Sequence, residues 1–296
     1  MKLDPYRVET YLTNRLDCPV RLIALEPLGD DTIRSTVAPS RKRHSLKTFG
    51  YGKPVRVRYE IEGQERCVVL STVSPNSFGH ETRADRAANQ VLAFDTYNEL
   101  PRHVHARDVG VLLPEGDLIS LSEGQEFFLL TEYVEGQSYA ADLQRLRDGG
   151  ELTDLDGTRA RQLASYLAGI HQKKRDAPAL YRRRLRDLIG SGEGLMGLTD
   201  SYPPDYPLAD AAWLHQIEQV CTRWRWWLKE RTHRLAQVHG DFHPFNILFG
   251  DGTAFRLLDR SRGAWGEPGD DVSALSINYL FFSLQRCGRL EMPFSA

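Results

Sequence analysis

The stretch His239-Gly240-Asp241-Phe242-His243-Pro244-Phe245-Asn246-Ile247-Leu248-Phe249 joins a polar loop to a hydrophobic strand. Asp251-Gly252 then favours a hairpin turn, and Phe255-Arg256-Leu257-Leu258-Asp259 is typical of a second strand that ends in a carboxylate. Phosphoryl transfer needs mainly alignment and charge neutralisation: a carboxylate orients the attacking hydroxyl, and an amide with a second carboxylate holds Mg²⁺ on the nucleotide phosphates. Asp241, Asn246 and Asp259 have side chains suited to these three tasks.

The order of these pieces resembles the aminoglycoside phosphotransferase and choline kinase family, whose catalytic loop reads H-G-D-x-x-x-x-N. The resemblance implies that Asp241 is the catalytic base, that Asn246 and Asp259 bind Mg²⁺, and that His239 braces the loop. Each piece alone is as typical of an ordinary turn or strand end as of a kinase. Together, in this order, they favour the family.

The same resemblance implies an α+β chain with a bilobal protein-kinase-like fold, in which a small antiparallel β-rich N-lobe precedes a larger, mainly helical C-lobe. We expect the N-lobe at residues 1–131, a hinge at 132–136, and the C-lobe with catalytic loop and acceptor site at 137–296. In the family, backbone groups of the hinge hydrogen-bond adenine. Glu132 and Val134 are therefore candidates for contact with the nucleotide.

Hydrophobic periodicity and turn residues predict the individual elements. Asp4 and Pro5 are typical of a helix start. We expect helices at 4–16, 81–97, 139–147 and 158–172, and another of about 20 residues that contains Trp213, Trp224, Trp226 and Trp227. We expect strands at 21–28, 55–61, 66–73 and 127–131. A Gly/Pro-rich insertion is expected at 189–207. The strand at 127–131 is expected to be buried. Tryptophans at helical spacing usually lie in a core, although this insertion borders the acceptor site in related enzymes.

Two polar residues outside the loop are expected to support it. Gly266-Glu267-Pro268-Gly269-Asp270-Asp271 is similar to the family's segment after the metal-binding Asp, and we expect Asp271 to contact the catalytic loop. Leu167-Ala168-Gly169-Ile170-His171 matches another element of the family. His171 is expected to be a packed structural histidine rather than a ligand.

The strand at 66–73 lacks the lysine that contacts the ATP phosphates in this fold, and its phase places Ser71 at that position. A serine brings no positive charge, so nucleotide binding should weaken unless another cation replaces the lysine. Lys53 is the first candidate, and Arg56 and Arg58 are alternatives.

The sequence also leaves more than one candidate for the loop that covers the phosphates. Gly50 and Gly52 are candidates because glycine lets backbone N–H groups approach a phosphate closely, and Gly29 is an alternative. The acid that pairs with the phosphate-binding cation is Glu81 or Asp85, unless these residues only cap the helix that follows.

Composition sets further limits. With 296 residues, 41% of them hydrophobic, and a net charge of −2, the chain can form a substantial core and has no strong attraction to nucleic acid or membranes. It shows no signal peptide or membrane-spanning run, and we expect a cytoplasmic protein. The scattered cysteines indicate neither a zinc site nor disulfides. If the C-terminal end is native, another subunit, as in a homodimer, would cover apolar surface of a shortened C-lobe.

The combined expectation is a phosphotransferase that uses ATP or GTP with Mg²⁺ and acts on a hydroxyl of a small molecule. One alternative is a degenerate kinase-like protein that binds a nucleotide or metabolite and regulates without phosphotransfer, as Ser71 suggests. Another is an enzyme of this fold that transfers a different group. The sequence does not identify the acceptor, although Lys173-Lys174-Arg175 and Arg182-Arg183-Arg184 disfavour a polycationic aminoglycoside.

Overall fold

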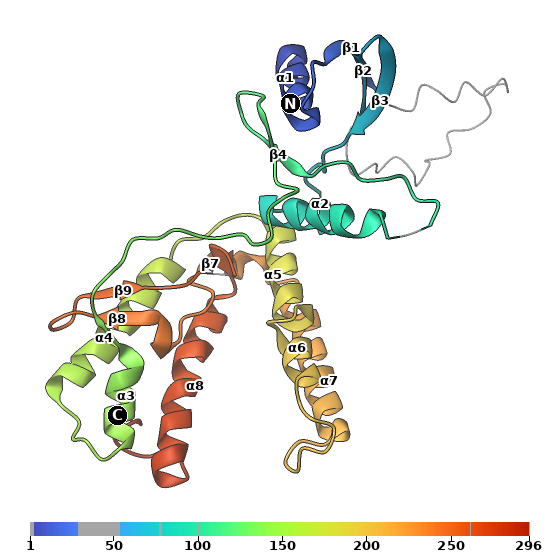
Figure 1. Ribbon diagram of the computed structural model, residues 1–296. Coiled ribbons are helices and arrows are strands. Elements are labelled where there is room, and N and C mark those ends of the chain that lie inside the picture. The colour runs from blue at the N-terminus through green and yellow to red at the C-terminus, as the bar shows by residue number, and fades with distance from the viewer. Residues whose placement is uncertain (1–2, 29–53, 77–78, 100, 261, 296) are drawn as a thin grey trace. The chain divides into compact units, whose positions relative to one another are not determined.

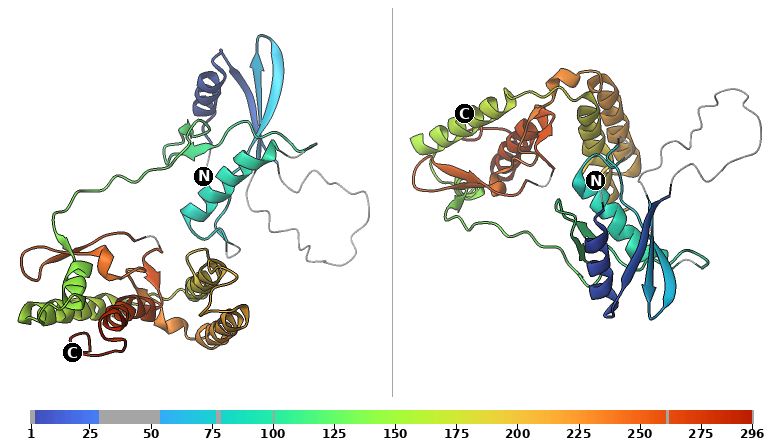
Figure 2. Two further views of the ribbon diagram at one scale, coloured as in Figure 1. Left: turned by 60° about the horizontal axis from the view of Figure 1, so that its bottom comes forward. Right: turned by 90° about the horizontal axis from the view of Figure 1, so that it is seen from above.

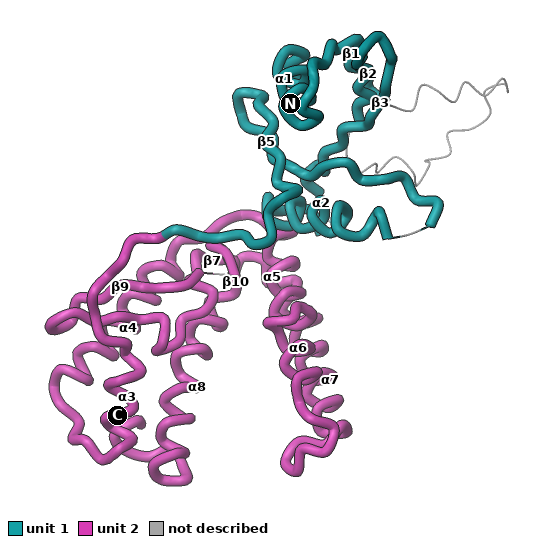
Figure 3. Tube along the Cα trace, in the orientation of Figure 1, with its two compact units in different colours: residues 1–130 teal, residues 131–296 magenta. Residues whose placement is uncertain are grey.

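The computed structural model describes residues 3–28, 54–76, 79–99, 101–260 and 262–295. The chain separates into two compact units, residues 1–130 and 131–296, shown in teal and magenta in Figure 3. Helices and small antiparallel sheets occur in both, so the chain is of the α+β class, as predicted. No helix in these ranges is long and apolar enough to cross a membrane.

Unit 1 is built on an antiparallel sheet of β1 (Arg21–Pro27), β2 (Val55–Ile61) and β3 (Gln64–Leu70), in the order β1-β2-β3. Every second residue of β2 points to one face and is buried, which packs the sheet against α1 (Pro5–Leu16). Asp4 caps this helix through a hydrogen bond from the N–H of Arg7. Glu62 and Gly63 both have positive φ, as a two-residue hairpin turn requires, so the predicted turn is confirmed.

The rest of unit 1 comprises α2 (Arg83–Tyr97) and a hairpin of β4 (Gly110–Leu112) and β5 (Leu118–Ser120). The predicted helix at 81–97 begins two residues late because Thr82 is its N-cap, in a reciprocal capping box with Asp85. The predicted strand at 66–73 likewise begins at Gln64 and ends at Leu70, where its pairing with β2 ends.

The predicted buried strand at 127–131 is wrong. The segment forms no strand, and Phe128 and Leu130 are 92% and 89% exposed. An apolar run becomes a buried strand only where another strand pairs with its backbone. Here β4 and β5 pair with each other, and none of the described strands pairs with this segment.

Unit 2 has its main core where α3 (Tyr139–Arg147), α4 (Asp154–His171) and α8 (Pro268–Cys287) meet a sheet of β6 (Gln137–Ser138), β8 (Ile247–Phe249) and β9 (Phe255–Leu257) (Figure 1). The strand order β6-β8-β9 makes β9 an edge strand. The core contains Leu163, Phe242, Ile247 and Phe249, each at most 1% exposed. The predicted helix at 158–172 begins earlier, at Asp154, because Thr153 and Asp156 form a capping box.

A second group of unit 2 consists of α5 (Pro178–Gly190), α6 (Leu195–Asp200) and α7 (Ala211–Leu228), which lie together in both views of Figure 2. The predicted Gly/Pro-rich insertion thus contains a short helix, α6. After α7 the chain forms η3 (Thr232–Arg234), β7 (Ala236–Gln237) and the short helix η4 (Pro244–Asn246). The strand β7 pairs with β10 (Trp265–Gly266).

The tryptophans of α7 were expected to lie in the core, and this is wrong. Trp213, Trp224, Trp226 and Trp227 are 49% to 58% exposed. Cations cover two of the rings: Lys229 Nζ lies 3.3 Å from the ring centre of Trp226, and the guanidinium of Arg231 lies 3.5 Å from that of Trp227. Periodicity alone does not distinguish a packed aromatic face from one covered by basic side chains.

Candidate active site

The loop after β7 is held by a network of polar contacts around His239, which is 5% exposed. Burial lowers the pKa of His239, so the neutral imidazole is favoured. The two contacts of the ring fit one tautomer: Nε2–H donates to the carbonyl of Leu258 at 3.0 Å, and Nδ1 accepts from the N–H of Asp241 at 3.3 Å. His239 thereby ties the loop to the end of β9.

Asp271 holds the same loop from the first turn of α8. Its fully buried carboxylate accepts hydrogen bonds from the backbone N–H groups of His239, at 2.9 Å, and Gly240, at 2.7 Å. The Nε2 atom of His171 lies 3.0 Å from the same carboxylate. Both sequence predictions are confirmed: Asp271 contacts the loop, and His171 is a packed structural residue.

The loop turns at Gly240, whose φ is +90°. A Cβ at this position would lie 3.2 Å from the Cβ of Arg262 and 3.4 Å from the carbonyl oxygen of Gly263. Glycine is therefore required both for the backbone conformation and for the close approach of the segment at 262–263.

In this loop Asp241 precedes η4, and Asn246 is the last residue of η4. The Nδ2 of Asn246 donates to the backbone carbonyl of Asp241 at 3.1 Å and to its Oδ2 at 3.2 Å. Two basic side chains also face Asp241: His243 Nε2 lies 3.4 Å from Oδ2, and Arg262 lies 3.6 Å from Oδ1. The Asp241 side chain remains 20% exposed, so solvent reaches it.

The β8–β9 hairpin returns the chain to this loop at Asp259. The N–H of Leu258 donates to the carbonyl of Asn246 at 2.8 Å, so Asp259 directly follows a residue bonded to the loop. The φ of Asp259 is +43°, an uncommon value for a residue other than glycine. Asp259 is exposed, and its carboxylate makes no hydrogen bond or ion pair within the described residues.

These side chains suit a magnesium ion by their chemistry. Asn246 uses its amide nitrogen to hold Asp241, which leaves its Oδ1 as an acceptor, and Asp259 offers a carboxylate. Mg²⁺ prefers such oxygen ligands and usually completes its shell with phosphate and water. Within the described ranges no group of three or more His, Cys, Asp or Glu side chains is placed to hold a metal.

A cavity of about 250 Å³ lies beside the loop, and its lining includes His239, Asp259, Tyr166 and Gln237. Asp241 and Asn246 are not among the lining residues. A larger cavity of about 440 Å³ lies on α7, between His215 and Arg223, and contains none of the predicted site residues.

Only some of the residues predicted to contact the nucleotide lie within the described ranges. Gly29, Gly50, Gly52 and Lys53 lie outside the described residues. Glu132 and Val134 lie at the start of unit 2 without regular structure, just before β6, which pairs with β8 through Gln137 and Phe249. That pairing connects the predicted hinge to the hairpin that ends at Asp259.

The candidates for a replacement cation on β2 already have partners. Arg56 donates to Glu26 at 2.6 Å, and Arg58 donates to Glu65 at 2.6 Å. Ser71 directly follows the last residue of β3, and its carbonyl accepts from the side chain of Gln90 in α2 at 3.2 Å.

Comparison with known families agrees with this geometry. The model of the phosphotransferase enzyme family matches residues 81–284, more than half of the chain and all of the loop, hairpin and Asp271 segment. The chain belongs to this family. The resemblance to aminoglycoside phosphotransferases and choline kinases is therefore confirmed, and a phosphotransferase activity is indicated in general terms. No curated protein matches the chain.

Two residues of this phosphotransferase were missed by sequence reasoning. Arg262 lies 3.6 Å from Asp241 and 4.0 Å from Asp270, so it faces both carboxylates. Burial raises the pKa of Asp270 to about 6, although the charge of Arg262 opposes this shift. The adjacent acids Asp270 and Asp271 were visible in the sequence, but nothing local indicated that Asp271 would be fully buried and Asp270 partly buried.

Proposed function

We propose that this protein transfers the γ-phosphoryl group of ATP, with Mg²⁺, to a hydroxyl group of a small molecule. The observation that carries the proposal is the side-chain contact between Asn246 and Asp241, together with the exposed carboxylate of Asp259 at the end of the adjoining hairpin. Membership of the phosphotransferase enzyme family supports it. The proposal includes a bilobal arrangement, with unit 1 as the N-lobe and residues 132–136 as the hinge.

Asp241 is proposed to orient the acceptor hydroxyl and to receive its proton. Its carboxylate is held by Asn246 and by the backbone bonds of the loop to Asp271, so its position is largely fixed before the substrate binds. Alignment matters more than strong basicity in phosphoryl transfer, since bond formation to the incoming oxygen is weak in the transition state.

Asn246 and Asp259 would hold the metal through oxygen atoms. Bound Mg²⁺ neutralises charge on the phosphates of the nucleotide. The chain's own contribution is to keep the two ligands at the open end of one hairpin, where the N–H of Leu258 donates to the carbonyl of Asn246.

The nucleotide is proposed to bind through the hinge and the glycine-containing segment of unit 1. Backbone groups at Glu132 and Val134 would contact the base, which leaves ATP and GTP both open. Gly50 and Gly52 would cover the phosphates, and Lys53 would supply the charge that Ser71 does not.

A second candidate function is nucleotide or metabolite binding without phosphotransfer. Its supporting observation is Ser71 at the expected lysine position, with Arg56 and Arg58 already paired to glutamates. Such a protein would keep the loop geometry of unit 2 and bind its ligand without turnover.

Calorimetric titration of the protein with ATP and GTP, with and without Mg²⁺, distinguishes the two. Mg²⁺-dependent binding followed by phosphorylation of at least one compound in a library of small alcohols supports the transferase. Asp241→Asn serves as the matched inactive control. Binding without any turnover favours the regulatory protein, and a folded protein that binds neither nucleotide, with Mg²⁺ or with Mn²⁺, contradicts the transferase.

A further inference from the structure

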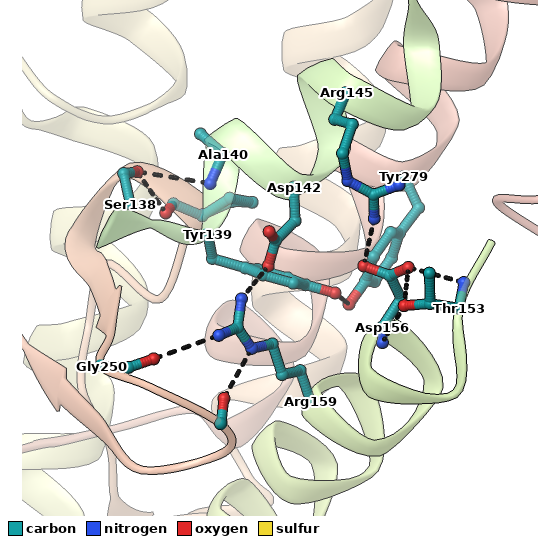
Figure 4. A network of polar contacts seen from close by, with 12 residues as sticks. Ser138, Tyr139, Ala140, Asp142, Arg145, Thr153, Asp156, Arg159, Gly250 and Tyr279 are labelled. Atoms are coloured by element: carbon teal, nitrogen blue, oxygen red, sulfur yellow. Dashed lines mark hydrogen bonds and ion pairs between the residues drawn. The ribbon is translucent and has the colours of Figure 1, made fainter. Parts of the chain in front are cut away.

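Arg159 is a buried arginine of α4 whose side chain is only 9% exposed. Its Nη1 donates to Asp142 of α3 at 2.7 Å, its Nε donates to the carbonyl of Gly252 at 2.8 Å, and its Nη2 donates to the carbonyl of Gly250 at 3.2 Å (Figure 4). The guanidinium also lies 4.5 Å from the ring centre of Phe249. One side chain therefore joins two helices to the turn of the β8–β9 hairpin.

That hairpin carries both proposed metal ligands at its open end. Its strands pair Ile247 with Leu257 and Phe249 with Phe255, Asn246 precedes the first strand, and Asp259 follows the second. The β8 arm is held on its other side by β6, but β9 is an edge strand that pairs only with β8 among the described strands. The position of Asp259 relative to Asn246 thus depends on the register and twist of this strand pair, together with the hydrogen bonds of Leu258 to Asn246 and His239.

A shift of β9 by a single residue would move Asp259 by more than the length of a metal–ligand bond. A slip of one residue moves a strand by about 3.3 Å, whereas Mg²⁺ requires ligands at about 2.0–2.1 Å in near-octahedral geometry. Arg159 opposes such a shift because it binds two carbonyl groups of the turn that joins the arms. Its own position is fixed by Asp142 and by burial.

We propose that Arg159 is a positioning residue: it fixes the β8–β9 turn so that Asn246 and Asp259 present their oxygens to one metal ion. The inference rests on the proposed function, since it concerns the metal site assigned there. It assigns Arg159 no contact with substrate or metal.

Arg145 of α3 provides a natural comparison. It also links α3 to the start of α4, through Asp156 at 2.6 Å (Figure 4). It donates as well to the carbonyl of Glu151 at 2.7 Å, but none of its described contacts is with the hairpin. Losing Arg145 weakens the helix packing alone. Losing the contacts of Arg159 weakens the helix packing and frees the turn.

Lysine is the informative substitution at both positions. Arg159→Lys keeps a positive charge beside Asp142, so no carboxylate is left buried without a partner, but a single ammonium group does not reproduce the planar fork that binds both turn carbonyls. Arg145→Lys makes the same chemical change away from the hairpin. Asp142→Asn removes the ion pair of Arg159 and keeps the carbonyl acceptors of the turn, and it is the second variant if Arg159→Lys folds poorly.

The test measures Mn²⁺ binding in the presence of ATP by electron paramagnetic resonance, and amide hydrogen exchange over residues 247–258 in the ligand-free protein. We expect Arg159→Lys to weaken Mn²⁺ binding at least tenfold and to speed exchange in the hairpin, while Arg145→Lys changes both less than twofold. We expect Asp142→Asn to lie between them. Wild-type Mn²⁺ affinity in Arg159→Lys, or equal loss in Arg159→Lys and Arg145→Lys, overturns the proposal.

The outcomes also separate this inference from the proposed function. If the wild-type protein binds Mn²⁺ and ATP but transfers no phosphoryl group, the proposed function fails and the binding comparison still decides the role of Arg159. If the wild-type protein binds no Mn²⁺ in the presence of ATP, both are overturned.

Discussion

The carboxylate of Asp271 accepts a 2.7 Å hydrogen bond from the backbone N–H of Gly240, across 31 residues of sequence. The bond satisfies a donor in a loop whose glycine has a φ of +90°, and the same carboxylate also binds the neighbouring N–H of His239. The conformation of the catalytic loop therefore depends on a residue of α8.

Asp271→Asn should destabilise unit 2. The change leaves one of two buried N–H groups facing an amide nitrogen, and it removes the charge that strengthens both hydrogen bonds. We expect a loss of about 2–4 kcal/mol in the free energy of unfolding, measured by urea denaturation. Asp251→Asn, at the exposed turn of the β8–β9 hairpin, is the control and should stay within about 0.5 kcal/mol of wild type. Wild-type stability in Asp271→Asn would contradict this role.

Asp259→Asn should abolish the Mg²⁺-dependent part of nucleotide binding and leave the fold intact. The carboxylate is exposed and makes no hydrogen bond or ion pair within the described residues, so its replacement by an amide of similar size costs little stability. The metal loses one negatively charged ligand. We therefore expect the Mg²⁺-dependent affinity for the nucleotide, measured by calorimetry, to fall at least tenfold, about 1.4 kcal/mol. Unchanged affinity would remove Asp259 from the metal site.

Asp241→Asn should separate binding from turnover. Nucleotide affinity is expected to stay close to wild type, while kcat falls by about 10²–10⁴-fold because the hydroxyl loses its proton acceptor. Asn246 can still donate to the new side-chain oxygen, so the loop should hold its shape. Steady-state kinetics with any accepted alcohol measures the effect, and equal kcat would exclude Asp241 as the base.

The sequence predicted the loop and hairpin well because their signals are local. Gly240 and the Asp251-Gly252 turn specify backbone conformations by residue type, and the strands on either side of the turn are short and mainly apolar. The contact of Asp271 was predicted from the family resemblance, since no local rule connects residues so far apart.

The failures arose where distant partners decide the structure. Residues 127–131 have strand-like composition but no strand to pair with among those described. The tryptophans of α7 are about half exposed, and cations cover two of their rings. Arg159 is one arginine among many in the sequence, and only the fold shows that it contacts the hairpin turn. The partial burial of Asp270 was not predictable from the sequence either.

The stability of the protein should depend on the ionisation of Asp270. Burial raises its folded-state pKa from 3.8 to about 6, so between these values the unfolded chain has released a proton that the folded chain retains. The contribution of Asp270 to the free energy of unfolding is therefore most favourable below pH 3.8. It falls as the pH rises to about 6 and stays low above that pH. Asp270→Asn removes this loss and should stabilise the protein at pH 7.5 by at most about 3 kcal/mol, with the gain shrinking toward pH 4. Urea denaturation across this range is the measurement, and a gain that grows at low pH would contradict it.

The replacement of the missing lysine is tested at Lys53 and Ser71. If Lys53 supplies the charge for the phosphates, Lys53→Ala should reduce ATP affinity or turnover at least tenfold, about 1.4 kcal/mol, whereas Ser71→Ala should have little effect. Arg56→Ala is the matched control, because Arg56 is a cation of the same lobe that already pairs with Glu26. A larger effect of Arg56→Ala than of Lys53→Ala would assign the phosphate contact to β2. Equal, small effects of both changes in a protein that still binds ATP without turnover would favour the regulatory protein, since then neither Lys53 nor Arg56 stabilises a transferred group.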